Sequence, residues 1–292
     1  MVILVSVFVG GLVLFHLLEP LAPVHPTYKA GVTRRGYIAD LIAAFVNGPV
    51  LSALTKIGVA LLVIQFPRAT STFTGWPWWA QFAVFFVAND FLRYWIHRWY
   101  HESDLLWRVH RVHHTVIEMD CLSVFRHHVL EGVIKNGVIF LPFQLMGLDE
   151  TVIIAYSSID ILKGFWHHAN LRTYIGPLNY FLNSPELHWW HHSTEARGQH
   201  ANYGSILSIW DVLFGTFLYQ PGEWPEHIGV EGMERFPDEY YQQLISITKT
   251  DDEIVNAGLR SSEAIAAEPA RGERATPATR AESRESGASA AI

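Results

Sequence analysis

The sequence contains few cysteines and few charged residues. Cys121 is the single cysteine among 292 residues, which excludes an intramolecular disulfide and thiolate-rich zinc or iron–sulfur sites. Charged residues make up 17% of the chain and hydrophobic residues 50%, a balance that favours a membrane protein over an ordinary soluble domain. A formal net charge of -7 indicates no basic surface for nucleic acid. Any metal must therefore be held by nitrogen and oxygen ligands.

The sequence also lacks the motifs of a self-sufficient redox enzyme. It has no GxGxxG fingerprint, no flavin motif and no fused haem domain, so the chain cannot take electrons from NAD(P)H unaided. Any redox reaction would require a separate electron donor protein.

Long apolar segments predict an all-α integral membrane bundle of about four to five hydrophobic helices. The segments are residues 1–18, 38–66, 78–96, 129–148 and 151–166. The first lacks a basic start and a cleavage pattern, so we expect a retained span. The second contains Asn47, Gly48, Pro49 and Lys56 and is expected to be tilted or broken. The last two predict a helical hairpin that either spans or re-enters the membrane.

The distribution of basic residues predicts the orientation. Lys29, Arg34 and Arg35 follow the first segment, whereas only Arg68 follows the second, which places the first loop in the cytoplasm. Counting spans from there puts a histidine-rich cap on the cytoplasmic face. We divide the chain into N-terminal membrane helices (1–77), a histidine-box domain (78–240) and a C-terminal tail (241–292). The tail is expected to be disordered from about Ser261, because it has few large apolar groups there.

Eight of the sixteen histidines fall into three groups with helical spacing. The groups are HxxxH at His97 and His101, HxxHH at His110, His113 and His114, and HxxHH at His188, His191 and His192. Residues three or four apart share a helix face, so each group can direct its imidazoles to one site. Eight imidazoles exceed the four ligands that one zinc ion usually takes, which favours two metals. Imidazole binds iron, zinc and copper, so ligand type alone does not name the ion.

Other polar residues near these groups have expected supporting roles. Asp90 shares a helix face with the first group, and we expect it to accept a ring N–H of a ligand; the alternative is an ion pair with Arg93 or Arg98. We expect the loop after the third group to be fixed by Asn202, Tyr203 and Asp211. The histidines without ligand spacing are assigned to capping, packing or the surface: His16, His25, His127, His200 and His227.

The motifs HRWYH, WRVHRVHH and HWWHH, followed by NYG and WDVLFGT, resemble the fatty acid hydroxylase and sterol desaturase superfamily over about residues 78–218. The resemblance implies catalytic and ligand roles for the eight histidines in a di-iron centre that activates O2. It also implies electrons from NAD(P)H through a separate donor, a cytochrome b5-like protein or a ferredoxin with its reductase.

Two looser matches concern residues outside the three groups. By its position, His168 resembles a further metal ligand of the family, with its neighbour His167 as the alternative, and Gly164 stands where several relatives carry glutamine. The sequence RHHVLE resembles the family's RxHPxE element, with Val129 in place of proline. There His128 either completes the metal shell or hydrogen-bonds to Glu131.

The expected function is O2-dependent hydroxylation, or desaturation, of a C–H bond in a membrane lipid or sterol. One alternative is a membrane zinc hydrolase, although the sequence HESDL at His101 lacks the second histidine of HExxH. The other is a non-catalytic haem-binding or metal-binding membrane protein, which would need only a few of these histidines.

Overall fold

The computed structural model describes residues 2–29, 31–65 and 72–257. Within these residues the fold is all-α and has no β-strand, only two isolated β-bridges. The tail from about Ser261, for which disorder is expected, lies outside the described residues.

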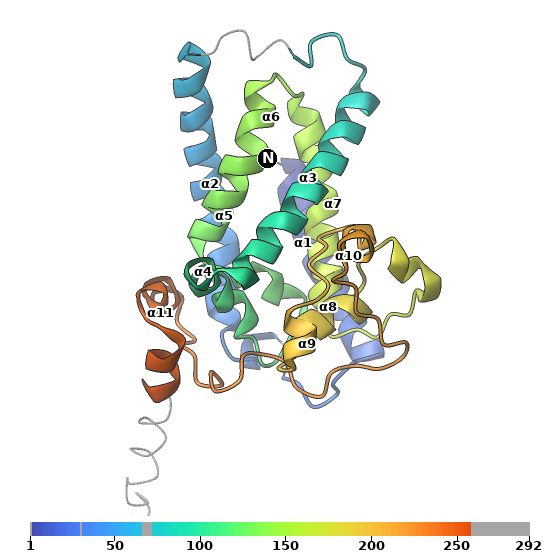
Figure 1. Ribbon diagram of the computed structural model, residues 1–292, viewed down its shortest axis with the longest axis vertical. Coiled ribbons are helices and arrows are strands. Elements are labelled where there is room, and N and C mark those ends of the chain that lie inside the picture. The colour runs from blue at the N-terminus through green and yellow to red at the C-terminus, as the bar shows by residue number, and fades with distance from the viewer. Residues whose placement is uncertain (1, 30, 66–71, 258–292) are drawn as a thin grey trace, which may run out of the picture.

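The long helices run side by side in the upper part of Figure 1. They are α1 (Val2–Leu18), α2 (Tyr37–Gln65), α3 (Trp78–Glu102) and α7 (Glu150–His168), together with one continuous helical segment. That segment consists of α5 (Val129–Lys135), the π-helical η5 (Asn136–Phe140) and α6 (Leu141–Leu145). The segment from α5 to α6 and helix α7 form the predicted hairpin. Its turn lies at the same end as the start of α3, opposite the shorter helices (Figure 1).

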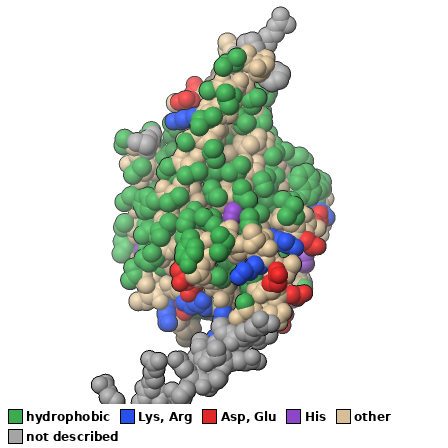
Figure 2. Space-filling model, turned by 90° about the vertical axis from the view of Figure 1, so that its left-hand side faces the viewer, with side chains coloured by type: hydrophobic (Ala, Val, Ile, Leu, Met, Phe, Trp, Pro, Cys, Tyr) green, Lys and Arg blue, Asp and Glu red, His purple; other side chains and the backbone are tan. Residues whose placement is uncertain are grey.

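Helices α1 and α2 are suited to cross a membrane. The stretches Val2–Leu21 and Tyr37–Leu62 have mean hydropathies of 2.3 and 1.6, and many of their large apolar side chains are exposed. Figure 2 shows apolar side chains over the end of the molecule formed by the long helices, with most charged groups toward the other end. The later predicted segments are helical but carry ionisable residues, among them Asp90 and Asp160. That they also span stays a prediction.

Helix α2 is continuous rather than broken. It runs for 29 residues with Pro49 inside, although proline removes one backbone hydrogen bond from a helix interior. The neighbouring Asn47 is buried; its amide donates to the carbonyl of His127 (3.1 Å) and its oxygen accepts from the Tyr240 hydroxyl. The polar residue therefore attaches α2 to the shorter elements and does not interrupt the helix.

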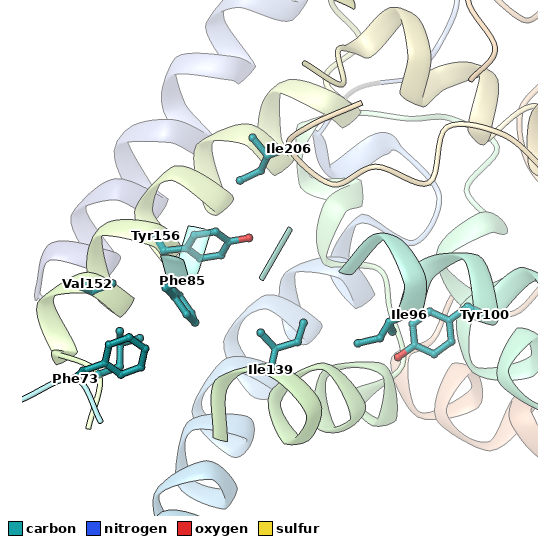
Figure 3. Close-up of a cluster of buried hydrophobic side chains, with 9 residues drawn as sticks. Phe73, Phe85, Ile96, Tyr100, Ile139, Val152, Tyr156 and Ile206 are labelled. Atoms are coloured by element: carbon teal, nitrogen blue, oxygen red, sulfur yellow. The ribbon is translucent and has the colours of Figure 1, made fainter. Parts of the chain in front are cut away.

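An apolar core joins α3, η5 and α7 (Figure 3). Phe85 of α3 and Tyr156 of α7 are fully buried and meet edge to face, with ring centroids 5.2 Å apart. Ile139 of η5 belongs to the same cluster, as do Ile96 and Tyr100 nearer the end of α3. Rings in this arrangement contribute beyond the area they bury. The core thus fixes α3 along the part that precedes and includes its histidines.

The shorter elements form a cap at one end of the long helices (Figure 1). They are α4 (Asp104–His114), η4 (Cys121–Phe125), α8 (Pro185–His191), α9 (Ala196–Gln199), α10 (Ile209–Phe214) and α11 (Tyr240–Ile245). The first loop lies on the same side, because the buried Arg34 pairs with Asp40 (2.6 Å) at the start of α2 and Asp120 (2.8 Å) beside η4.

Residues 241–257, which fall in the expected C-terminal tail, pack against α4. The guanidinium of Arg111 pairs with Asp251 and donates to the carbonyls of Ser246 and Lys249. Ile254 contacts Val112 in a small apolar cluster. Folded structure therefore continues to residue 257.

Candidate metal centre

Helices α3 and α4 position the first two histidine groups. Helix α3 continues through Ile96 to Glu102, so His97 and His101 lie one turn apart on its last turns. After the turn at Ser103, α4 packs against α3 and ends at His114. The rings of His101 and His114 are consequently only 4.7 Å apart, centre to centre.

The third group lies on the short, buried helix α8. Ser184 caps this helix by accepting a hydrogen bond from the Glu186 N–H, and Pro185 occupies its first turn. Both features favour a helix start at this position. Helix α8 carries His188 and His191, while His192 immediately follows the helix end.

The histidines from these elements form two sets. Within each set the candidate ligand atoms all lie within 4.8 Å of one another: His97, His101, His110, His114 and His191 in the first, and His113, His168, His188 and His192 in the second. The sets adjoin, because the rings of His114 and His192 stack with centroids 4.5 Å apart. The structure thus brings together all nine histidines expected at the metal site.

Hydrogen-bond acceptors of the protein fix the orientation of each of five of these rings. The Nδ1 atoms lie at hydrogen-bond distance from Tyr203 O (His97, 2.8 Å), Ala201 O (His191, 2.8 Å), Arg126 O (His113, 3.0 Å), Gly164 O (His168, 3.0 Å) and Glu131 Oε2 (His110, 3.1 Å). Each acceptor favours the tautomer with its proton on Nδ1, which leaves the Nε2 lone pair free for a metal.

The distances between the Nε2 atoms suit coordination of a metal ion. In the second set, Nε2 of His168 lies 3.2 Å from that of His113 and 3.0 Å from that of His188. Nitrogens bound at about 2.1 Å to one ion are about 3.0 to 3.4 Å apart at ordinary coordination angles. In the first set, the buried Nε2 atoms of His97, His101 and His191 have no hydrogen-bond partner. Unpartnered buried nitrogens are costly unless a ligand satisfies them.

Burial also keeps the imidazoles neutral. It lowers the pKa of His114, His191 and His192 well below the usual value, and the neighbouring histidines lower it further. A neutral imidazole is the form that binds metals. Both histidine sets therefore fit metal ions held by nitrogen.

The two looser family matches, at His168 and at His128, have different outcomes in the structure. His168 belongs to the second set, whereas Nε2 of His167 lies 2.6 Å from the carbonyl oxygen of Asn183. The ring of His128 bonds to groups other than the Glu131 carboxylate: its Nε2 donates to the Leu244 carbonyl and its Nδ1 accepts from the Leu130 N–H. Glu131 instead accepts from His110.

Gly164 is explained by close packing. A Cβ atom there would lie 2.7 Å from Cγ2 of Val124. A larger residue would require the Val124 side chain to move. The Gly164 backbone carbonyl, rather than a side chain, supports His168.

Both roles expected for Asp90, as acceptor for a histidine ring N–H and as ion-pair partner of Arg93 or Arg98, were wrong. Its carboxylate accepts from the backbone N–H groups of Ile206 (2.8 Å) and Leu207 (3.1 Å) and from the indole of Trp210 (2.8 Å), not from a histidine. Arg93 and Arg98 pair with other acids. Asp90 therefore fastens the loop after α9 to α3.

That loop is fixed as expected. Asp211 accepts from the N–H groups of Tyr203 (2.7 Å) and Gly204 (2.8 Å). Asn202, at a positive φ of 57°, donates its amide to the carbonyls of Leu187 and Leu218. These contacts place the Tyr203 carbonyl against His97.

Sequence spacing missed one further group. His16 and Glu19, three residues apart, meet the distant Cys121, and the ligand atoms of the three residues lie within 4.8 Å of one another. The Cys121 Sγ lies 3.2 Å from His16 Nδ1, and Glu19 accepts from the Cys121 and Asn170 N–H groups. No local pattern signals this group, because the residues lie on separate elements.

A cavity of about 310 Å³ adjoins the histidines. Its walls include His97, His110, His113, His168 and His188, together with residues of α2, α3, α5, η5 and α7. Apolar residues such as Ile96 and Ile139 line it beside ionisable ones such as Arg93 and Lys163. The cavity thus connects the histidine sets with the space between the long helices.

Comparison with known proteins agrees with these features. Residues 82–216 match the family described as fatty acid hydroxylase. The chain is 30% identical to the ornithine lipid hydroxylase OlsE of Rhizobium tropici over 242 residues, which cover 77% of this chain and 70% of that protein. No solved structure matches the chain.

Two other kinds of relative are more distant or only partly covered. The human alkylglycerol monooxygenase is 31% identical over 142 residues, 49% of this chain but only 31% of that protein. The very-long-chain aldehyde decarbonylase GL1-9 of Oryza sativa subsp. japonica is 26% identical over 223 residues, 73% of this chain and 84% of that protein. Together with the match over residues 82–216, these similarities show that the chain belongs to the fatty acid hydroxylase family.

Proposed function

We propose that this protein is a membrane-bound, non-haem di-iron oxygenase that hydroxylates a C–H bond of a membrane lipid, with desaturation as the related outcome. The observation that carries the proposal is the pair of adjoining buried histidine sets beside a cavity between long helices. Relatives named ornithine lipid hydroxylase and alkylglycerol monooxygenase support a lipid substrate and oxygen insertion.

The five histidines of the first set would hold one iron ion and the four of the second set the other. When bound, the iron pair would supply the O2-activating redox chemistry that side chains lack. Hydroxylation consumes one C–H bond, O2, two electrons and two protons and yields one C–OH group and one water. Desaturation takes the same inputs and removes two hydrogens, giving a double bond and two waters. The electrons would come from NAD(P)H through a separate donor protein.

The side chains around the two sets would orient the ligands and exclude water. Carbonyl groups of Tyr203, Ala201 and Arg126 keep protons on Nδ1 of the rings they contact. Glu131 does the same for His110 with a carboxylate. Because these acceptors belong to packed elements, the ring planes are set before any ion binds.

We further propose that the cap faces the cytoplasm. The first loop carries Lys29, Arg34 and Arg35, and basic loops stay on the cytoplasmic side. The ion pair between Arg34 and Asp120 joins this loop to the cap. An even number of crossings between the two ends of the histidine domain, two or none, would keep all histidines on that side.

Metal analysis and substitution of purified full-length protein test the function. Two iron ions per chain support the oxygenase, whereas a single zinc would indicate a hydrolase and haem absorbance a haem carrier. Replacing His110, His114 or His191 by alanine should abolish lipid oxidation and lower bound iron, while the protein still inserts in the membrane. His227→Ala is the matched control, because that side chain is 76% exposed. Wild-type turnover by metal-free His114→Ala protein would contradict the proposal.

A further inference from the structure

Lys163 is a basic side chain that the proposed chemistry does not use. It lies on α7, one turn before His167, and lines the cavity beside the histidine sets. Its ammonium contacts His167 Nε2 and the Asn183 carbonyl and lies 4.7 Å from the centre of the Trp166 ring. None of these three partners carries a negative charge.

The acids near Lys163 already have other partners. Asp160, on the same helix, pairs with Arg93 at 2.6 Å. Asp90 accepts hydrogen bonds from the backbone N–H groups of Ile206 and Leu207 and from the indole of Trp210 in α10.

The remaining acid in the cavity wall is also occupied. Glu131 pairs with Lys135 at 2.9 Å and accepts from His110. Among the described residues that line the cavity, the lysines and arginines therefore exceed the carboxylates by one, and Lys163 is the cation without an ion pair.

Building on the proposed function, we propose that Lys163 binds an anionic oxygen group, a carboxylate or a phosphate, at the polar end of the lipid substrate. A buried ammonium without a counter-ion is unfavourable, and a charge-assisted hydrogen bond from an oxyanion offsets that cost. Lys163 is thus a specificity-determining residue that favours acidic amphiphiles over neutral ones.

The position of Lys163 also restricts which carbon is oxidised. The ring of its partner His167 stacks on His188 of the second set, with centroids 4.9 Å apart. An anion at Lys163 therefore lies close to the metal site, and the oxidised carbon lies near the head group rather than far along the acyl chain. The cavity of about 310 Å³ is at the small end of ligand sites and suits the polar end of a lipid.

The apolar part of the lipid has a separate place. A groove on the outer face of α3 and η5 has only apolar lining: Phe91, Leu92, Trp95, Ile96, Trp99 and Val138. Ile96 lines both the groove and the cavity. The hydrocarbon tail would leave the cavity past Ile96 and lie in this groove.

Equilibrium binding of matched amphiphiles to the purified full-length protein tests the inference without turnover. The probes are N-palmitoylglycine, its neutral methyl ester and hexadecyl phosphate, each titrated in detergent. Wild-type protein should bind at least one anion about tenfold more tightly than the ester, which corresponds to about 1.4 kcal/mol. Whichever anion binds more tightly identifies carboxylate or phosphate as the preferred group.

Substitutions assign the preference to one side chain. Lys163→Met should lose the preference for the anion and keep its affinity for the ester, whereas Lys163→Arg should retain the preference. Lys163→Gln provides a second neutral variant if the methionine variant does not fold. Lys56→Met is the matched control, since Lys56 is exposed on α2 and does not line the cavity.

Equal binding of acid and ester by the wild type, or an unchanged preference in both neutral variants, would overturn the inference. Iron counted on the same samples tests the proposed function separately. A protein without iron that still prefers the anion contradicts the di-iron proposal alone.

Discussion

Glu131→Gln isolates the contribution of one residue that supports a histidine. The buried carboxylate of Glu131 accepts from His110 Nδ1 (3.1 Å) and from Lys135 Nζ (2.9 Å). Glutamine preserves the size of the side chain but removes the negative charge that strengthens both contacts. Loss of such a support lowers metal affinity by about 10- to 100-fold, which is about 1.4 to 2.7 kcal/mol.

The effect should be confined to the first set. His110 is the only one of the five supported rings held by a carboxylate, whereas the other four contact backbone carbonyls that no substitution removes. We therefore expect Glu131→Gln to weaken one of two metal-binding steps and leave the other unchanged.

The assay is an anaerobic titration of metal-free, full-length protein with Fe²⁺ against a competing chelator. Glu102→Gln is the matched control, because Glu102 pairs with Arg98 on the surface and its side chain is 48% exposed. If Glu131→Gln binds both ions as tightly as the control variant, the carboxylate does not support a ligand and the assignment of His110 fails.

Three further predictions concern stability and topology. A chain truncated after residue 250 should be about 1 to 3 kcal/mol less stable than one truncated after residue 257, because it loses the Asp251 partner of the buried Arg111; equal melting temperatures would show that the contact is unimportant. In a chain without the native cysteine, a cysteine at the exposed Ala196 should react with an impermeant thiol reagent only after cells are permeabilised, while one at the exposed Thr74, at the opposite end, should react in intact cells; the reverse labelling would invert the proposed orientation. Burial raises the pKa of Asp211 from 3.8 to about 7, so the stability this group contributes is present in acid and is lost as pH rises through about 7; Asp211→Asn should flatten the unfolding profile between about pH 4 and pH 8, and an unchanged slope would contradict the assignment.

Local periodicity made the helices and the histidine groups predictable. Apolar runs of sufficient length anticipated α1, α2, α3 and the hairpin to within a few residues, and α3 carries His97 and His101 on its last turns, as the HxxxH spacing predicts. Steps of three and four residues anticipated that His97 and His101 serve one set, whereas the second and third groups are each divided between the two sets. Of the two alternatives for the second segment, tilted or broken, the broken one was wrong, since α2 runs continuously through Pro49 and contacts of Asn47 attach it to the cap.

The sequence by itself determined which histidines come together, and the tertiary structure decided how they are divided and supported. His113 and His114 are adjacent in the chain but belong to different sets, as do His191 and His192. Consecutive helical residues point about 100° apart. Each pair serves two sites because the rings of α4 meet those of α8 and its C-cap, with His114 4.7 Å from His191 and 4.5 Å from His192, centre to centre. Apart from the Glu131 carboxylate, the acceptors that orient the rings are backbone carbonyls, which no residue type signals. Their positions depend on long-range contacts such as those of Asp90, and a one-dimensional spacing rule contains no information about them.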